Sequence, residues 1–155
     1  MNTPPEISHL RVLVVGAGVI GTVYGAQLAA AGNAVSVLAH GTRTDEVARD
    51  GLIVQDALDG TRLSSDVTLV RDAAGDVYDL VLIAVRSDQL SITCDVVGTL
   101  SGHPTLLFFG NNPAGHAAIP STLSGTVHLG FPGIGGSLCA GTVHYVRIPQ
   151  QPTAL

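Results

Sequence analysis

A strand, a tight turn and a helix follow one another in the stretch Arg11-Val-Leu-Val-Val-Gly16-Ala-Gly18-Val-Ile-Gly21-Thr-Val-Tyr-Gly25. Its Gly-x-Gly-x-x-Gly spacing suits a dinucleotide: Gly16 allows the turn, Gly18 lets the backbone approach a pyrophosphate, and Gly21 lets the helix pack closely on the sheet. Free N–H groups at the start of such a helix, and the positive end of its dipole, attract phosphate. A second strand, predicted at Ala34–Leu38, completes the strand-turn-helix-strand context of a dinucleotide site.

The apolar run from Leu10 to Ala31 has two other interpretations. It is about as long as a membrane span, and Ala29-Ala30-Ala31 resembles a signal-peptidase site. A secretory signal has a shorter apolar region, however, and only Arg11 adds positive charge before it. Repeated glycines behind a Val/Leu run with strand character are unusual in a spanning helix, although Gly21 and Gly25 would suit a helix dimer in a membrane. We therefore predict neither a targeting segment nor a membrane partner.

The composition favours one domain with buried strands. Of 155 residues, 46% are apolar and 12% are charged, which fits an α/β protein whose parallel strands are covered on both faces. We expect a loose arm over residues 1–9, which contains Pro4-Pro5, and a dinucleotide-binding domain over residues 10–155. The net charge of −5 and the absence of a Lys/Arg cluster argue against a nucleic-acid partner.

The cysteines and histidines indicate no metal site. Cys94 and Cys139 fit neither a disulfide framework nor a metal motif, and the six histidines lack ligand spacing. Since no signal peptide is recognised, we expect a reducing, cytoplasmic location. All seven basic residues are arginines, so no lysine of this sequence can serve as an acid or a phosphate ligand.

Apolar runs alternate with helical segments along the rest of the chain. Asp59-Gly60 lies between strand-like runs and predicts a hairpin or loop reversal, and Gly51 suits the end of a helix that Thr44 could cap. We expect strands at Leu10–Val15, Ala34–Leu38, Leu52–Asp56, Leu63–Val70, Tyr78–Val85, Thr105–Phe109, Thr126–Gly130 and Thr142–Ile148, helices at Val19–Ala31, Thr42–Asp50, Asp88–Leu100 and Ala117–Leu123, and a Gly-rich loop up to Gly141.

This alternation predicts an α/β fold of the Rossmann type, with a doubly wound, mainly parallel sheet, helices on both faces and right-handed crossovers. Ligands of such sheets lie beyond the carboxyl ends of the strands, where the strand order reverses. Four loops are expected to converge there, at Gly16–Gly21, Ala39–Arg43, Val85–Gln89 and Gly110–Gly115.

The end of the second strand indicates which dinucleotide binds. NAD sites place an Asp or Glu there for the ribose hydroxyls, whereas this chain reads Leu38-Ala39-His40-Gly41-Thr42-Arg43, without an acid. The missing carboxylate removes repulsion of a 2′-phosphate, and Arg43, with His40 and Thr42, can donate to one. We therefore favour NADP over NAD, and expect Arg43→Ala to weaken NADPH binding while NADH binding stays nearly unchanged. The alternatives are a solvated helix-start residue for Arg43 and a neutral surface histidine for His40.

Several spaced motifs together resemble one family. They are Gly-Ala-Gly-Val-Ile-Gly-Thr-Val-Tyr-Gly (16–25), Val-Ser-Val-Leu-Ala-His-Gly-Thr-Arg (35–43), Gly51-Leu52, Tyr-Asp-Leu-Val-Leu-Ile-Ala-Val-Arg-Ser-Asp-Gln (78–89) and Leu-Leu-Phe-Phe-Gly-Asn-Asn-Pro-Ala-Gly (106–115). From about Arg11 to its last residue, the chain resembles the N-terminal half of ketopantoate reductases (2-dehydropantoate 2-reductases). The resemblance implies NADPH-dependent reduction of an α-keto acid to a 2-hydroxy acid, either 2-dehydropantoate to pantoate or a related substrate, in pantothenate biosynthesis.

The resemblance also implies roles for residues at the cofactor. The family's glycine turn matches Gly16, Gly18 and Gly21. Its arginine after the second strand falls on His40, three residues before Arg43, which is a departure from the family pattern. The cofactor-binding residues that we predict are Gly16, Ala17, Gly18, Val19, Ile20, Gly21, His40, Thr42, Arg43, Val85, Arg86, Gln89 and Asn111.

Two further positions are the catalytic candidates. The family's lysine near the nicotinamide falls on Arg86, and its Asn-Gly pair falls on Asn111-Asn112, so Asn111 would lie beside the nicotinamide and the α-keto acid. Asn112 in place of glycine, followed by Pro113, suggests a divergent subfamily. Without the resemblance, the Asn-Asn-Pro run is ordinary turn chemistry and Arg86 a partner for Asp88.

The family's general acid is a lysine in a C-terminal helical domain. This chain has no lysine and its sequence ends at Leu155, so we expect the cofactor domain of a reductase about twice as long, catalytically incomplete by itself. A sheet face without that second domain would expose apolar surface and favour a homo-oligomer. The alternative is a stand-alone nucleotide-binding or redox-sensing module without catalysis.

Overall fold

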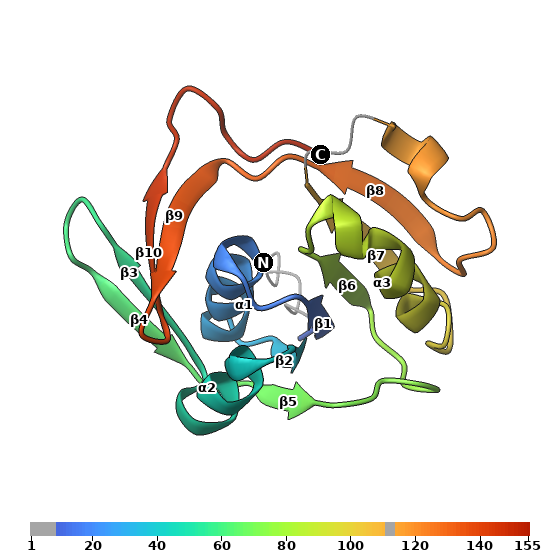
Figure 1. The fold of residues 1–155 in the computed structure, drawn as a ribbon, viewed down its shortest axis with the longest axis horizontal. Coiled ribbons are helices and arrows are strands. Elements are labelled where there is room, and N and C mark those ends of the chain that lie inside the picture. The colour runs from blue at the N-terminus through green and yellow to red at the C-terminus, as the bar shows by residue number, and fades with distance from the viewer. Residues whose placement is uncertain (1–8, 111–113) are drawn as a thin grey trace, which may run out of the picture.

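The described residues, 9–110 and 114–155 of a computed structural model, form two β-sheets with a helix between them (Figure 1). The larger sheet holds six parallel strands in the order β5-β2-β1-β6-β7-β8. Counted along the chain within this sheet, that is the order 3-2-1-4-5-6 of a Rossmann sheet, which confirms the predicted fold class. The strands are β1 (Arg11–Val15), β2 (Ala34–Leu38), β5 (Thr68–Val70), β6 (Leu80–Ile83), β7 (Thr105–Phe109) and β8 (Thr126–Gly130).

The second sheet has four strands in the order β4-β3-β10-β9, and the sequence patterns do not predict it. Asp59-Gly60 turns the chain between antiparallel β3 and β4, as expected. The expected single strand Leu63–Val70 is wrong, because the chain leaves this sheet after Ser65 and adds β5 to the larger one. The expected loop before Gly141 is wrong in part, because it contains β9. The strands are β3 (Leu52–Asp56), β4 (Arg62–Ser65), β9 (Ile134–Cys139) and β10 (Thr142–Arg147).

Both corrections have one physical cause. Main-chain pairing with distant segments decides where these strands lie, and a short polar or Gly-rich run carries little local signal for it. Strand β10 pairs in parallel with β3 across more than eighty residues of chain, and β9 then adds to β10 as an antiparallel hairpin.

Helix α1 (Val19–Ala30) lies between the two sheets and contacts both (Figure 1). A helix covered on two sides is apolar all round, which accounts for the membrane-like run Leu10–Ala31. A Cβ at Gly25 would lie 2.8 Å from Leu52 of the second sheet and 3.3 Å from Val14 of the first, so this glycine sets the spacing of both. No helix in the described part of the chain is long and apolar enough to cross a membrane.

Two apolar cores lie on opposite faces of the larger sheet. Val12 and Val14 belong to the core around α1, whereas Leu13 and Val15 belong to the core with α3 (Leu90–Val97). Successive side chains of β1 therefore serve different cores, as expected for a strand buried on both faces. Helices cover both faces of this sheet, as predicted.

The remaining elements differ from expectation mainly at their ends. Helix α2 (Thr42–Asp50) ends at Gly51, which has a φ of +69°, but Thr44 lies inside the helix and donates to the Ala39 carbonyl. The expected helix Asp88–Leu100 divides into a 3₁₀ turn, η1 (Ser87–Gln89), and α3, and the expected helix Ala117–Leu123 is replaced by a 3₁₀ turn, η2 (Gly115–Ala118). Of the predicted arm, residues 1–9, only His9 is described.

Gly21→Ala should prevent stable folding, because a Cβ at this position would lie 1.8 Å from the Gly16 carbonyl oxygen and α1 would have to leave β1. We expect the free energy of unfolding in urea to fall by at least about 3 kcal/mol. Gly18→Ala is the matched control: no atom lies within 4 Å of its Cβ position, and its φ of −77° suits alanine. Wild-type stability in Gly21→Ala would contradict this packing.

Candidate functional site

A cleft of about 460 Å³ lies at the carboxyl ends of β1, β2 and β6, where the strand order reverses. Strand β1 pairs with β2 on one side and with β6 on the other, so the loops that follow them diverge and leave this space open. The cleft is where the sequence places the dinucleotide. It is lined by Gly16, Ala17, Gly18, His40, Arg43, Ala84, Val85, Arg86, Gln89, Ile92 and Thr93.

Some predicted cofactor residues lie outside this lining. Val19 and Ile20 pack against the core from the first turn of α1, Gly21 is buried, and Thr42 is exposed at the start of α2. Asn111 falls outside the described residues, together with Asn112 and Pro113. Contact of these residues with a cofactor stays a prediction. The predicted residues that the structure brings together are Gly16, Ala17, Gly18, His40, Arg43, Val85, Arg86 and Gln89.

Sequence reasoning missed three lining residues, Ala84, Ile92 and Thr93. Ala84 follows β6 directly and donates its N–H to the Val15 carbonyl. Ile92 belongs to α3 and is 70% exposed at the border of the cleft. A signal was available in the sequence, because Gln89, Ile92 and Thr93 have the i, i+3, i+4 spacing that places helical side chains on one face.

The glycine turn is held by its backbone. Gly16 has a φ of +95° and donates its N–H to the Leu38 carbonyl, 3.0 Å away, so the turn is joined to the end of β2. A Cβ on Gly16 would lie 2.5 Å from the Ala84 carbonyl oxygen, which ties the turn to the end of β6 as well. At Gly18, by contrast, the space beside the Cα is open. The turn is thus tightly packed on its inner side and accessible at its second glycine.

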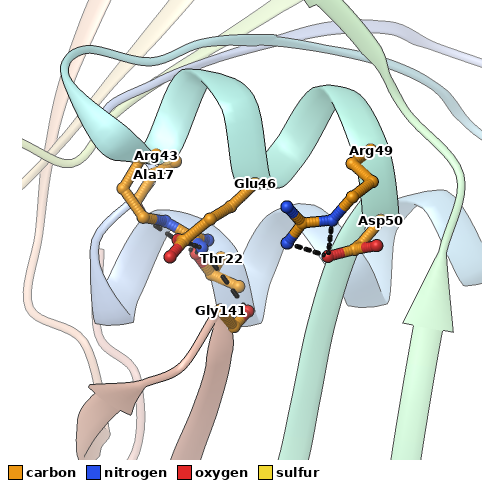
Figure 2. Close-up of polar contacts among 7 residues, drawn as sticks. All are labelled: Ala17, Thr22, Arg43, Glu46, Arg49, Asp50 and Gly141. Atoms are coloured by element: carbon orange, nitrogen blue, oxygen red, sulfur yellow. Dashed lines mark hydrogen bonds and ion pairs between the residues drawn. The ribbon is translucent and has the colours of Figure 1, made fainter.

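Arg43 is part of the protein framework and is not a solvated helix-start residue. Its side chain is 12% exposed, and its Nε donates to the Ala17 carbonyl at 2.8 Å (Figure 2). One terminal nitrogen pairs with Glu46 at 2.7 Å, and the other donates to the Thr22 hydroxyl at 3.2 Å. The first α2 turn is thereby bonded to the glycine turn and to α1.

The described lining of the cleft contains basic side chains and no acidic ones. The basic residues are His40, Arg43 and Arg86. Arg86 differs from Arg43 in being 82% exposed, and it pairs with Asp88 at 3.1 Å, as the alternative interpretation expected. An ion pair between two exposed side chains contributes little to stability, so Arg86 can leave it for a ligand at small cost.

A larger cavity, of about 710 Å³, opens beside the cleft and shares Val85 and Arg86 with it. It lies at the carboxyl ends of β6, β7 and β8, and its walls are mainly aromatic and aliphatic. The last residues of the chain form one edge, because Phe131 and Ala154 exchange backbone hydrogen bonds of 2.8 and 3.1 Å. The lining comprises Ile83, Val85, Arg86, Ser87, Asp88, Leu90, Phe108, Phe109, Gly110, Leu129, Gly130, Phe131, Ala154 and Leu155.

The two cysteines are free, as expected, and lie in different environments. Cys94 lies on the buried face of α3, and burial raises the pKa of its thiol, so it stays protonated and unreactive at neutral pH. Cys139 is exposed at the end of β9. Neither side chain lines the cleft or the larger cavity.

Comparison with known proteins identifies the family. The family model described as ketopantoate reductase PanE/ApbA matches residues 12–134. The chain belongs to the ketopantoate reductase family. The matched range contains the glycine turn, the end of β2 and the loop after β6, so it includes every residue of the cleft lining. No match was found among curated proteins.

Solved structures of 2-dehydropantoate 2-reductases and of D-mandelate dehydrogenase share the fold of the domain. A probable 2-dehydropantoate 2-reductase from Bacillus subtilis superposes with a TM-score of 0.76 at 17% identity, over 89% of this chain and 47% of that one. A 2-dehydropantoate 2-reductase from Methylococcus capsulatus gives 0.68 at 26% identity, over 88% and 45%. D-Mandelate dehydrogenase, solved with NADH and anilino(oxo)acetate, gives 0.67 at 18%, over 86% and 45%. This chain spans about half the length of these proteins.

The contacts of Arg43 predict that this ketopantoate reductase domain depends on it for stability. Arg43→Ala removes charge-assisted hydrogen bonds to partly buried partners and leaves the Ala17 carbonyl with fewer donors. We expect a loss of about 2 kcal/mol in the free energy of unfolding, measured by urea denaturation. Arg49→Ala, on the same helix, is the control. The ion pair of Arg49 with Asp50 is exposed, so the midpoint of urea denaturation should stay close to that of the wild type (Figure 2). Equal midpoints for both variants would contradict the role of Arg43.

Proposed function

We propose that this chain is the NADP-binding domain of an oxidoreductase that transfers hydride from NADPH to an α-keto acid, 2-dehydropantoate or a related substrate. The observation that carries the proposal is the cleft at the reversal of strand order, with the glycine turn on one side and no acid among its described lining residues. Membership of the ketopantoate reductase family supports the reaction class.

The glycine turn fits a pyrophosphate. The space beside Gly18 is open, because no heavy atom lies within 4 Å of the position that a Cβ on this residue would take. The first N–H groups of α1 have no partner within the helix, and the helix dipole adds positive potential at the same end. A pyrophosphate here would therefore be bound mainly by backbone N–H groups, as in other sites of this geometry.

The end of β2 fits a 2′-phosphate better than free ribose hydroxyls. Strand β2 runs into Ala39-His40, and His40 is exposed at the cleft without a neighbouring lining carboxylate. Arg43 lies in the same region, where each of its guanidinium nitrogens donates to a protein acceptor and one of them pairs with Glu46. D-Mandelate dehydrogenase, whose structure holds NADH, has a similar fold, so a titration that compares NADPH with NADH distinguishes the two cofactors.

The larger cavity would receive the nicotinamide and the α-keto acid. It adjoins the cleft at Val85 and Arg86, and a guanidinium at that junction suits the substrate carboxylate. When bound, NADPH supplies the hydride for the keto carbon, while the keto oxygen needs a proton from a general acid. The chain has no lysine, and we propose that the acid comes from the second domain that the family resemblance implies. Asn111 is proposed beside the substrate on the same resemblance.

Titration of the purified chain into NADPH and into NADH tests the cofactor. The nicotinamide fluorescence can be followed easily because the chain contains no Trp. We expect tighter binding of NADPH, and we expect His40→Ala to raise the Kd for NADPH about fivefold while the Kd for NADH changes less than twofold. His103→Ala is the control, since His103 is exposed, bonded to Ser124 and absent from the cleft lining.

Each outcome of this titration has a distinct meaning. Equal affinity for the two cofactors, unaffected by His40→Ala, would contradict the NADP preference while leaving the dinucleotide site intact. Failure of the folded chain to bind either cofactor would contradict the proposed function of this domain. Tight binding without reduction of α-keto acids, even in a chain that carries the second domain, would favour the stand-alone binding or sensing module instead.

A further inference from the structure

The structure assigns Arg43 a positioning role: it fixes the Ala17 carbonyl toward the protein interior and thereby directs the Gly18 N–H into the cleft. This inference rests on the proposed function, because it explains how the glycine turn is held ready for a pyrophosphate. It differs from the expectation drawn from the sequence, in which Arg43 contacts a 2′-phosphate directly.

Three groups close a small polar triangle behind the turn. The Ala17 carbonyl accepts from the Arg43 Nε at 2.8 Å and from the Thr22 hydroxyl at 3.1 Å. The same hydroxyl accepts from a terminal nitrogen of Arg43 at 3.2 Å. Thr22 is fully buried in α1, so it cannot turn away to solvent. The carbonyl is thus held from two sides, once by a charged donor.

The geometry of the peptide bond converts this anchor into an orientation of the turn. In a trans peptide the C=O of one residue and the N–H of the next point in opposite directions within one plane. A carbonyl of Ala17 that points toward Arg43 and Thr22 therefore directs the N–H of Gly18 away from them. Gly18 is exposed, and the space beside it is open. Rotation of this peptide would break both hydrogen bonds to the carbonyl.

A fourth contact extends the anchor to the second sheet. The Arg43 nitrogen that pairs with Glu46 also donates to the Gly141 carbonyl, at a longer distance of 3.4 Å. Gly141 belongs to the tight turn between β9 and β10, where Ala140 and Gly141 both have positive φ. Figure 2 shows this turn, α2 and the glycine turn meeting at the one guanidinium.

Direct binding of a 2′-phosphate would compete with these contacts. Each of the three guanidinium nitrogens already donates to a protein acceptor, and the side chain is 12% exposed. A phosphate that accepted from two of these nitrogens at once would compete with at least one of the protein acceptors. His40, which is exposed, has no such restraint.

The test compares the Kd values of NADPH and NADH for Arg43→Ala with those for the wild type. Because the turn binds the pyrophosphate common to both cofactors, we expect both Kd values to rise about tenfold and their ratio to stay within twofold of the wild-type ratio. Arg43→Lys should not rescue binding, since one ammonium cannot reproduce the forked contacts. Thr22→Val keeps the shape of the side chain but removes the hydroxyl, and it should raise the Kd values of NADPH and NADH about threefold. This variant tests the same role if Arg43→Ala does not fold.

Two controls separate positioning from general stability. Val47→Ala shortens a buried apolar side chain of the same helix and removes none of the hydrogen bonds to the turn, so it should lower the Tm while leaving both Kd values unchanged in the folded protein. Arg49→Ala should change neither quantity. A loss confined to NADPH would show direct 2′-phosphate binding, and unchanged Kd values in folded Arg43→Ala and Thr22→Val would overturn the positioning role. A wild type that binds neither cofactor would instead refute the proposed function.

Discussion

The close approach of helix α1 to strand β1 is the constraint on which the rest of this structure depends. Gly21 lies against the Gly16 carbonyl, and Gly25 lies between Val14 and Leu52, so the helix touches both sheets at positions where no side chain would fit. This contact gives the domain its order of layers. It also places the first turn of α1 at the end of β1, where the glycine turn can present its backbone to a ligand.

The same close packing buries backbone and side-chain oxygens behind the glycine turn, and these oxygens need hydrogen-bond donors from within the protein. The Ala17 carbonyl and the Thr22 hydroxyl lie behind the turn, and a buried oxygen without a donor would be costly. Arg43, on helix α2, donates a hydrogen bond to each of these two oxygens. Arg86 carries the same guanidinium at the opposite side of the cleft, yet it is exposed and held only by Asp88. One arginine therefore belongs to the framework, and the other is available to a ligand.

The cleft and the larger cavity share one wall but differ in chemistry. The cleft is formed by backbone and cationic groups at the reversal of strand order, whereas the larger cavity is mostly apolar and extends to the last residues of the chain. Such a division suits a ligand with a charged middle and a flat, apolar end. The proposed function uses both spaces together, the cleft for the phosphates of the cofactor and the larger cavity for its nicotinamide and the α-keto acid.

Local patterns in the sequence determined the strand-turn-helix unit, the parallel sheet, the hairpin at Asp59-Gly60 and most of the cleft lining, because glycine spacing and apolar periodicity report short-range geometry. Only the tertiary structure decided that the run Leu63–Val70 divides between two sheets and that β9 pairs with β10. It also decided the partners of Arg43, which come from distant segments. Pairing across many residues depends on which backbone edges and buried oxygens meet in space, and no local pattern records that meeting.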